Sequence, residues 1–160
     1  MDRFGYARTI DKSTYERNKE TADSENKYVF TCMNTGKICL FTDAGRMHTI
    51  KVQELPFGKF RDKGIPVDNV SNYDSAAEQI VLAGSMSEII HTTLCFVTSK
   101  GMVKLVEGKE FDVAKRTISS TKLIEEDSIV MVQNAEPMEH LVLQTKEGYF
   151  LKFFKSRNSI

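Results

Sequence analysis

The sequence predicts an all-β protein built from repeated hairpins. Short runs rich in β-branched and aromatic residues alternate with glycine-bearing turns along the 160 residues, and helical periodicity is nearly absent. In four segments two strands surround a polar turn that ends in glycine, at Gly5, Gly45, Gly101 and Gly148. Hairpin turns need the positive φ that glycine adopts freely. A period of roughly 40 to 50 residues with several strands per unit is typical of bladed β structures.

Nine strands are expected, each bounded by turn residues. They are Tyr28–Cys32, Lys37–Thr42, Arg46–Lys51, Gln79–Ala83, Leu94–Thr98, Met102–Val106, Ser128–Gln133, His140–Thr145 and Tyr149–Phe154. Ser-x-x-Glu signatures at Ser13 and Ser75 predict at most single helical turns, because no apolar stripe follows them. The polar, acid-rich stretch 16–27 is expected to be a flexible surface loop.

The repeats divide the chain into units 1–27 (partial), 28–90, 91–138 and 139–160 (partial) of one domain. This amounts to about three blades, whereas a closed propeller typically takes about 4 to 8. We therefore expect an incomplete array from a longer domain, with Met1 as an added start. Unfinished strand edges favour self-association. The expected core residues are Phe30, Phe41, Leu94, Phe96, Val103, Val130, Leu141, Leu143, Phe150 and Phe153.

Composition and motifs exclude several functional classes. No run approaches the ~18 apolar residues of a membrane span, and the charged first twenty residues are no signal peptide, so a cytoplasmic chain without a membrane partner is expected. Phosphate-loop, dinucleotide-binding and nucleophile motifs are missing. Cys32, Cys39 and Cys95 are expected to be buried thiols, although the first two could face each other across a hairpin. His48, His91 and His140 show no ligand spacing, so neither catalysis nor a metal is expected.

The net charge of zero conceals a segregation along the chain. Residues 46–63 carry five basic and two acidic side chains, and residues 100–122 carry six and three. The stretches 64–88 and 123–147 are acidic. The third residue after a turn glycine is basic at Arg8, His48 and Lys104. Equivalent positions of stacked repeats share one surface, so the cations are expected to form a discontinuous track; ordinary solvated strand faces are the alternative.

Four segments carry a resemblance to a known family. Residues 40–70, LFTDAGRMHTIKVQELPFGKFRDKGIPVDNV, resemble the blade signature of the C-terminal domain found in the A subunits of bacterial DNA gyrase and its relative, topoisomerase IV. Residues 98–123 resemble the next blade, residues 142–153 the start of another, and residues 2–18 the opening segment of the domain. The matching residues are Phe41-Thr42, Gly45-Arg46, Lys51-Val52, Glu54-Leu55-Pro56, Lys63-Gly64, Pro66 and Asn69. The resemblance covers essentially the whole chain.

The resemblance implies a β-pinwheel, a propeller-like array whose neighbouring blades exchange strands and whose basic outer rim binds and bends duplex DNA. Such a module is non-catalytic and needs no cofactor: the cleaving tyrosine lies in the preceding part of the same polypeptide, and ATP and Mg²⁺ are used elsewhere in the holoenzyme. The implied partners are double-stranded DNA, the ATPase B subunit, and the remainder of the A subunit, in a heterotetramer near the nucleoid.

One segment departs from the gyrase pattern. In gyrase a basic, glycine-rich box that wraps DNA follows the equivalent of Tyr15, whereas here Glu16 to Asp23 reads ERNKETAD. This favours a topoisomerase IV type, or a degenerate gyrase-like protein, with relaxation and decatenation rather than negative supercoiling. Arg61, Lys63 and Gly64 in the second unit and Lys115 and Arg116 in the third lie at the corresponding blade positions and are expected to substitute in part.

The expected contacts with DNA are phosphate contacts that read little sequence. The predicted DNA-binding residues are Arg46, Lys51, Lys59, Arg61, Lys63, Lys104, Lys115, Arg116, Lys122 and Lys152. Phe57 and Phe60 either pin their loop or, if exposed, act as wedges between bases. The alternative function is a protein-interaction scaffold without a DNA role, which would use the acidic segments 64–88 and 123–147.

Overall fold

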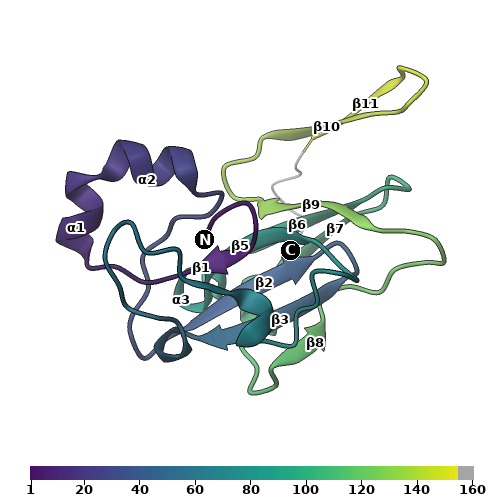
Figure 1. Cartoon of the computed structure of the whole chain (residues 1–160). Coiled ribbons are helices and arrows are strands. Elements are labelled where there is room, and N and C mark those ends of the chain that lie inside the picture. The colour runs from purple at the N-terminus through teal and green to yellow at the C-terminus, as the bar shows by residue number, and fades with distance from the viewer. Residues whose placement is uncertain (155–160) are drawn as a thin grey trace.

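The computed structural model describes residues 1–154, which form four antiparallel sheets and three short helices (Figure 1). The strands are β1 (Tyr6–Ala7), β2 (Lys37–Thr42), β3 (Arg46–Lys51), β4 (Ile65–Pro66), β5 (Ile80–Ser85), β6 (Thr93–Thr98), β7 (Val103–Glu107), β8 (Thr117–Ser119), β9 (Ile129–Asn134), β10 (His140–Gln144) and β11 (Phe150–Phe154). The helices are α1 (Lys12–Arg17), α2 (Lys19–Glu25) and α3 (Met86–Ile89), and 3-10 turns cover Val52–Glu54, Val67–Asn69 and Gly108–Phe111. The predicted all-β class is confirmed.

Neighbouring repeats exchange strands. The largest sheet has the order β5-β2-β3-β8, so β8, which follows the β6–β7 hairpin in sequence, completes the sheet of the preceding repeat. In the same way β4, which follows the β2–β3 hairpin, pairs with β1. We call the β1–β4 pairing the first junction and the β3–β8 pairing the second junction. Strands exchanged between neighbouring repeats are the feature that the predicted pinwheel requires.

The β2–β3 hairpin is buried on both faces, because successive side chains of a strand point to opposite sides. Ile38, Leu40 and Ile50 pack with Ala7 and Val67 around the first junction. On the opposite face, residues of β2 and β3 pack against the β7-β6-β9 sheet in a second core; its buried members include Cys39, Phe41, Met47, Leu94, Phe96 and Ile129. This double burial explains the unbroken apolar run from Ile38 to Phe41.

The β10–β11 hairpin extends away from the rest of the molecule (Figure 1). Its contact with the β7-β6-β9 sheet runs through β10, where Leu141 and Leu143 pack against Cys95 and Val97. On β11, Phe150 is 69% exposed. The burial predicted for Phe150 and for Phe153, which is also exposed, is therefore wrong.

Two further core predictions are wrong for reasons of strand geometry. Val130 sits where the β6–β9 register shifts, between Met131 opposite Val97 and Ile129 opposite Thr98. The extra residue of such a bulge is unpaired, and the Val130 side chain is exposed. Val103 is exposed on β7, which among the described residues is an edge strand. Phe41, Leu94 and Phe96 are buried as predicted, and Phe30 packs at the margin of the first core.

Two predictions of secondary structure are wrong. Residues 28–32 form no strand, and residues 16–25 form no loop. The side chains of Tyr28, Phe30 and Cys32 pack against the first core, but their backbone joins no sheet. Because Cys39 faces Thr49 and Gly84 in its sheet, the hairpin that was to oppose Cys32 and Cys39 does not form. The expected flexible loop is instead the end of α1 and all of α2.

The helical segment depends on local polar contacts. The carboxylate of Asp11 accepts hydrogen bonds from the backbone N–H of Thr14 at 2.8 Å and from the hydroxyls of Ser13 and Thr14, so Asp11 caps α1 in place of Ser13. Ion pairs four residues apart, Lys12–Glu16 and Lys19–Asp23, follow along the two helices. Only Ala22 is buried, which explains why no apolar stripe marks this segment.

Candidate nucleic-acid interface

At both junctions a cation lies close before the exchanged strand: Arg116 immediately precedes β8, and only Gly64 separates Lys63 from β4. Ala7 pairs with Ile65 and Met47 with Ile118, so Gly64 in the first junction corresponds to Thr117 in the second. By the same register Lys63 corresponds to Arg116. The structure thus gives Lys63 and Arg116 equivalent places, whereas by the same register Arg61 corresponds to Ala114 and Lys115 to Asp62.

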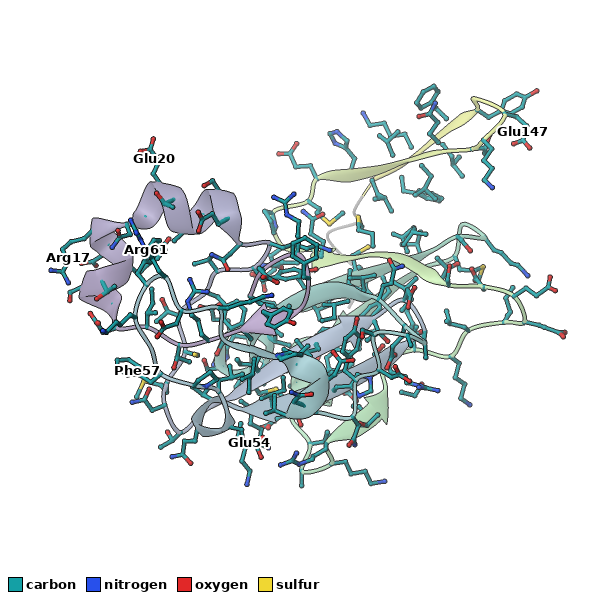
Figure 2. The ribbon with its side chains drawn as sticks, in the orientation of Figure 1. Arg17, Glu20, Glu54, Phe57, Arg61 and Glu147 are labelled. Carbon is teal, nitrogen blue, oxygen red and sulfur yellow. The ribbon has the colours of Figure 1, made fainter. Side chains whose placement is uncertain are left out.

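At the second junction the structure gathers four cations around the end of β3. Lys51 is the cross-strand partner of Lys37, and the Lys37 ammonium donates to the carbonyl of Val113 at 3.3 Å. That carbonyl belongs to the loop that continues into Lys115 and Arg116. The Arg116 guanidinium forms an ion pair with Glu54, which Figure 2 shows at the lower edge of the molecule. Lys37 was not among the predicted residues, although a β2–β3 hairpin centred on Ala44 places it opposite Lys51.

The loop before the first junction is held against the N-terminal segment. Arg8 donates to the carbonyl of Phe60 at 2.6 Å, and the Lys63 ammonium lies 4.1 Å from the centre of the Tyr6 ring. The backbone N–H of Lys59 donates to the Asp62 carboxylate at 2.7 Å. Arg61 is exposed beside the helices (Figure 2), where it lines a hollow shared with Asn18, Thr21 and Glu25 of that segment.

Phe57 and Phe60 differ in exposure. Phe60 is partly buried, whereas Phe57 is 72% exposed. The loop around Phe57 is held by its backbone, because Thr9 donates to the carbonyl of Pro56 at 2.9 Å and accepts from Gly58 at 3.1 Å. The ring of Phe57 therefore does not pin the loop, and its action as a wedge stays a prediction.

The remaining predicted cations do not join these two groups. Arg46 begins β3 and Lys51 ends it, so they lie at opposite ends of one strand. Lys122 lies near Arg46, because Gly45 accepts hydrogen bonds from the N–H groups of Ser120 and Thr121. Lys104 lies on β7 and Lys152 on β11. All ten predicted residues are exposed, and they are spread over the two junctions, the Arg46 end of β3, and strands β7 and β11. That they form one discontinuous track stays a prediction.

His48 was expected on the basic track and is buried instead, with a side chain that is 1% exposed. Its Nε2 lies 2.7 Å from Oε1 of Glu78, and its Nδ1 lies 3.0 Å from Oγ1 of Thr117. The other Glu78 oxygen accepts from the Thr42 hydroxyl at 2.5 Å. Nothing in the sequence linked His48 to Glu78, because a loop of irregular structure brings the carboxylate to β3.

Other kinds of site find no support in residues 1–154. Within them, no group of three or more His, Cys, Asp or Glu side chains is placed to hold a metal ion. No described helix is long and apolar enough to cross a membrane. Cys39 and Cys95 are buried free thiols and Cys32 is partly exposed. Burial raises the pKa of all three, most strongly that of Cys39, to about 12, which makes them poor nucleophiles.

Sheets completed by strands from the following repeat, with cations before each exchanged strand, define a propeller-like repeat domain. The family model described as DNA gyrase C-terminal domain, beta-propeller, matches residues 36–76 and 92–133, more than half of the chain. The chain therefore belongs to the DNA gyrase C-terminal domain family. The two matched segments begin just before the β2–β3 and β6–β7 hairpins and each include the exchanged strand that follows.

Relatives and solved structures agree with this assignment. The DNA gyrase A subunit of Lawsonia intracellularis is 26% identical across 96% of this chain, and the DNA gyrase A subunit of Streptococcus pneumoniae is 26% identical across 95%. The chain spans 20% of the length of each. The crystal structure of the C-terminal domain of DNA topoisomerase IV matches 94% of this chain and 49% of its own with a TM-score of 0.79 and 26% identity. The E. coli ParC C-terminal domain has a TM-score of 0.67 over 96% of this chain and 62% of its own, and at 13% identity it supports the fold alone.

Proposed function

We propose that this chain is a non-catalytic module of the A subunit of a bacterial type IIA topoisomerase, and that it binds and bends duplex DNA. The supporting observation is the equivalence of Lys63 and Arg116, which occupy the same register position next to the two exchanged strands and each have further cations beside them. Cations at equivalent places of successive repeats suit a polymer with a regular spacing of phosphates. The module would act with the rest of its own polypeptide and with an ATPase B subunit. ATP and Mg²⁺ would be used in those parts of the enzyme.

The acidic segments offer less to the alternative scaffold function than their composition suggests. In segment 64–88, Glu78 is buried, Asp68 accepts from the N–H of Ser75, and Asp74 accepts from the N–H of Ala76. In segment 123–147, Asp127 accepts from the Ser99 hydroxyl and from backbone N–H groups. Several of these acids serve local structure, so they form a poorer binding surface than a count of charges indicates.

We further propose that the parent enzyme relaxes or decatenates DNA and does not introduce negative supercoils. The place of the basic gyrase box holds α1 and α2, with Glu16, Glu20 and Asp23. There the Tyr15 hydroxyl donates to Asp23, which also pairs with Lys19. A segment of this charge repels phosphates, so wrapping would depend on the cations at the two junctions.

The test is duplex binding by the 160-residue chain across a salt series. Each phosphate neutralised contributes about −0.9 to the slope of log K against log salt. Changing Arg61, Lys63, Lys115 and Arg116 together to Glu should abolish measurable binding at salt where the unchanged protein binds. The matched control changes the exposed Lys27, Lys100, Lys109 and Lys146 to Glu, an equal change of net charge away from the junctions. Equal losses in both variants would contradict the junction as the site, and no binding by the unchanged chain at low salt would favour the scaffold.

A further inference from the structure

A chain of polar groups runs through the second junction from an exposed end to a buried one. It begins at Asn72, whose side-chain N–H donates to the Thr117 hydroxyl at 3.0 Å. It continues through His48 to Glu78, and it ends where the Thr42 hydroxyl donates to Glu78. The chain joins β2, β3, the segment before β5 and the exchanged strand β8. Of these four segments, β8 alone comes from the following repeat.

In a neutral His48 the contacts assign the ring proton to Nε2. Glu78 accepts at one oxygen from Thr42, so its other oxygen is free to accept from Nε2–H of His48. Nδ1 of a neutral His48 then accepts from the Thr117 hydroxyl, whose oxygen still accepts from Asn72. Both ring nitrogens of His48 and both carboxylate oxygens of Glu78 have partners in this Nε2–H tautomer. The Tyr73 ring and the imidazole meet edge to face, and the Arg46 guanidinium lies 3.9 Å from Oε1 of Glu78.

Few other hydrogen bonds hold strand β8. It pairs with β3 at only three positions, and its backbone neighbours add the bonds from Thr49 N–H to the carbonyl of Arg116 and from Ser120 N–H to the carbonyl of Gly45, both at 2.8 Å. Thr117 directly follows Lys115 and Arg116. A side-chain contact at Thr117 therefore fixes the point at which the cationic loop joins the sheet.

We propose that His48 is a positioning residue for DNA binding: held by Glu78, it anchors Thr117 and thereby sets the position of Lys115 and Arg116 against the end of β3. His48 and Thr117 would not touch DNA themselves. The inference rests on the proposed function, because it assigns these two cations a role on phosphates. Loss of the anchor should weaken DNA binding without changing any surface charge.

The decisive substitution is Thr117→Val, which keeps the shape of the side chain and removes the hydroxyl from His48 and Asn72. The matched control is Ser119→Ala on the same strand, whose hydroxyl donates to the Thr121 carbonyl and does not contact His48. In Thr117→Val we expect about a tenfold weaker duplex affinity at low salt and a salt slope shallower by about one phosphate contact. Amide exchange at Thr49, whose N–H bonds to Arg116, should accelerate. Ser119→Ala should leave all three quantities unchanged.

Two further measurements keep the outcomes distinct. Nitrogen NMR of the 160-residue chain should show His48 as the Nε2–H tautomer, with the Nδ1 resonance moving in Thr117→Val. Faster exchange at Thr49 with unchanged affinity and slope would overturn the positioning role.

If Thr117→Val fails to fold by circular dichroism, Asn72→Ala removes the exposed end of the same chain of polar groups. It should give a smaller loss of affinity in the same direction, and an unchanged salt slope would again overturn the positioning role. If Lys115→Glu/Arg116→Glu leaves DNA binding intact, the failure lies in the proposed function at these cations.

Discussion

The two junctions hold the exchanged strand in different ways. At the first junction two backbone segments approach each other closely, whereas at the second junction side chains form hydrogen bonds. Gly64 has φ +82°, and a Cβ built on it would lie 2.2 Å from the carbonyl oxygen of Ala7. The equivalent residue of the second junction is Thr117, which offers a hydroxyl to His48 and Asn72. The first junction thus has a residue without a side chain at this position, and the second junction has a residue whose side chain forms hydrogen bonds.

The position opposite the exchanged strand shows the same division. Arg8 and His48 are both the third residue after a turn glycine, and both hold the segment that arrives from the next repeat. Arg8 donates to the Phe60 carbonyl before β4, and His48 contacts Thr117 on β8. A basic residue at this place therefore serves the junction, and charge alone does not identify it as a DNA contact.

The largest expected effect concerns the core beneath the second junction. Phe41 meets Phe96 and Phe111 edge to face, with ring centres 5.9 Å and 5.0 Å apart, and Ile118 of β8 packs against the same core. Phe41→Ala should lower the free energy of unfolding by about 3–5 kcal/mol in urea titrations. Amide exchange should accelerate at the second junction more than at the first. Phe57→Ala is the control, and because its ring is exposed it should change the free energy by less than about 0.5 kcal/mol. Similar costs for the two would contradict the assigned core.

The next effect tests the close contact at the first junction. Gly64→Ala adds both left-handed backbone strain and a clash with a backbone oxygen, so a cost of about 2–5 kcal/mol is expected. Gly101 has φ +80° with no atom within 4 Å of an added Cβ, so Gly101→Ala isolates the strain at about 1–2 kcal/mol. Thermal unfolding compares the two. Equal costs would show that the approach of Gly64 to Ala7 is unimportant.

The hairpins were predictable because their signals are local. Alternation of apolar residues and a turn glycine specify β2–β3 and β6–β7 whatever the rest of the chain does. The same alternation failed at Tyr28, Phe30 and Cys32, because it reports burial of side chains and no neighbouring strand edge accepts their backbone. The helices α1 and α2 were missed because they bury only Ala22, although Asp11 and the ion pairs four residues apart were visible in the sequence.

The candidate site was predictable as a set of cations and not as an arrangement. Exposure of Lys51, Arg61 and Arg116 follows from their charge. The burial of His48 depends on Glu78, which lies thirty positions away in sequence and reaches β3 through an irregular segment. Such a partner is specified by tertiary packing alone. Equally, nothing local indicated that Arg46 and Lys51 occupy opposite ends of the central sheet.

A smaller effect should appear at alkaline pH and distinguish the two cores. Burial raises the pKa of Cys39, in the second core, to about 12, and raises that of Cys32, at the first core, less strongly. A thiol whose folded pKa exceeds its unfolded value stabilises the fold below the unfolded pKa, and this contribution is lost as pH rises toward the folded pKa. From about pH 8.5 upward the free energy of unfolding should fall by at most ~1.4 kcal/mol per pH unit for each such thiol.

Urea titrations between pH 8 and 11 measure this slope. Cys39→Ala should flatten it more than Cys32→Ala does. Tyr28 and Tyr73, whose pKa values burial also raises, add to the slope in the upper part of this range in every variant. The same flattening in both cysteine variants would mean that the two cores exclude water equally.

The smallest effect concerns the helices that follow the first junction. The hydroxyls of Ser13 and Thr14 and the N–H of Thr14 hold the pKa of Asp11 well below its usual range. A carboxylate with a lowered folded pKa stabilises above its unfolded pKa, and this stabilisation is lost as pH falls below about 3.9. Asp11→Ala should therefore reduce helical circular dichroism at pH 7 and leave little difference from the unchanged protein in strong acid. Asp74→Ala, which removes a similar backbone contact in a turn, is the control without helix loss.

Amide exchange at Thr9, which bonds to Pro56, should stay slow in Asp11→Ala, because the close contact of Gly64 holds the first junction independently of α1. Faster exchange there would show that the helices and the first junction form one cooperative unit.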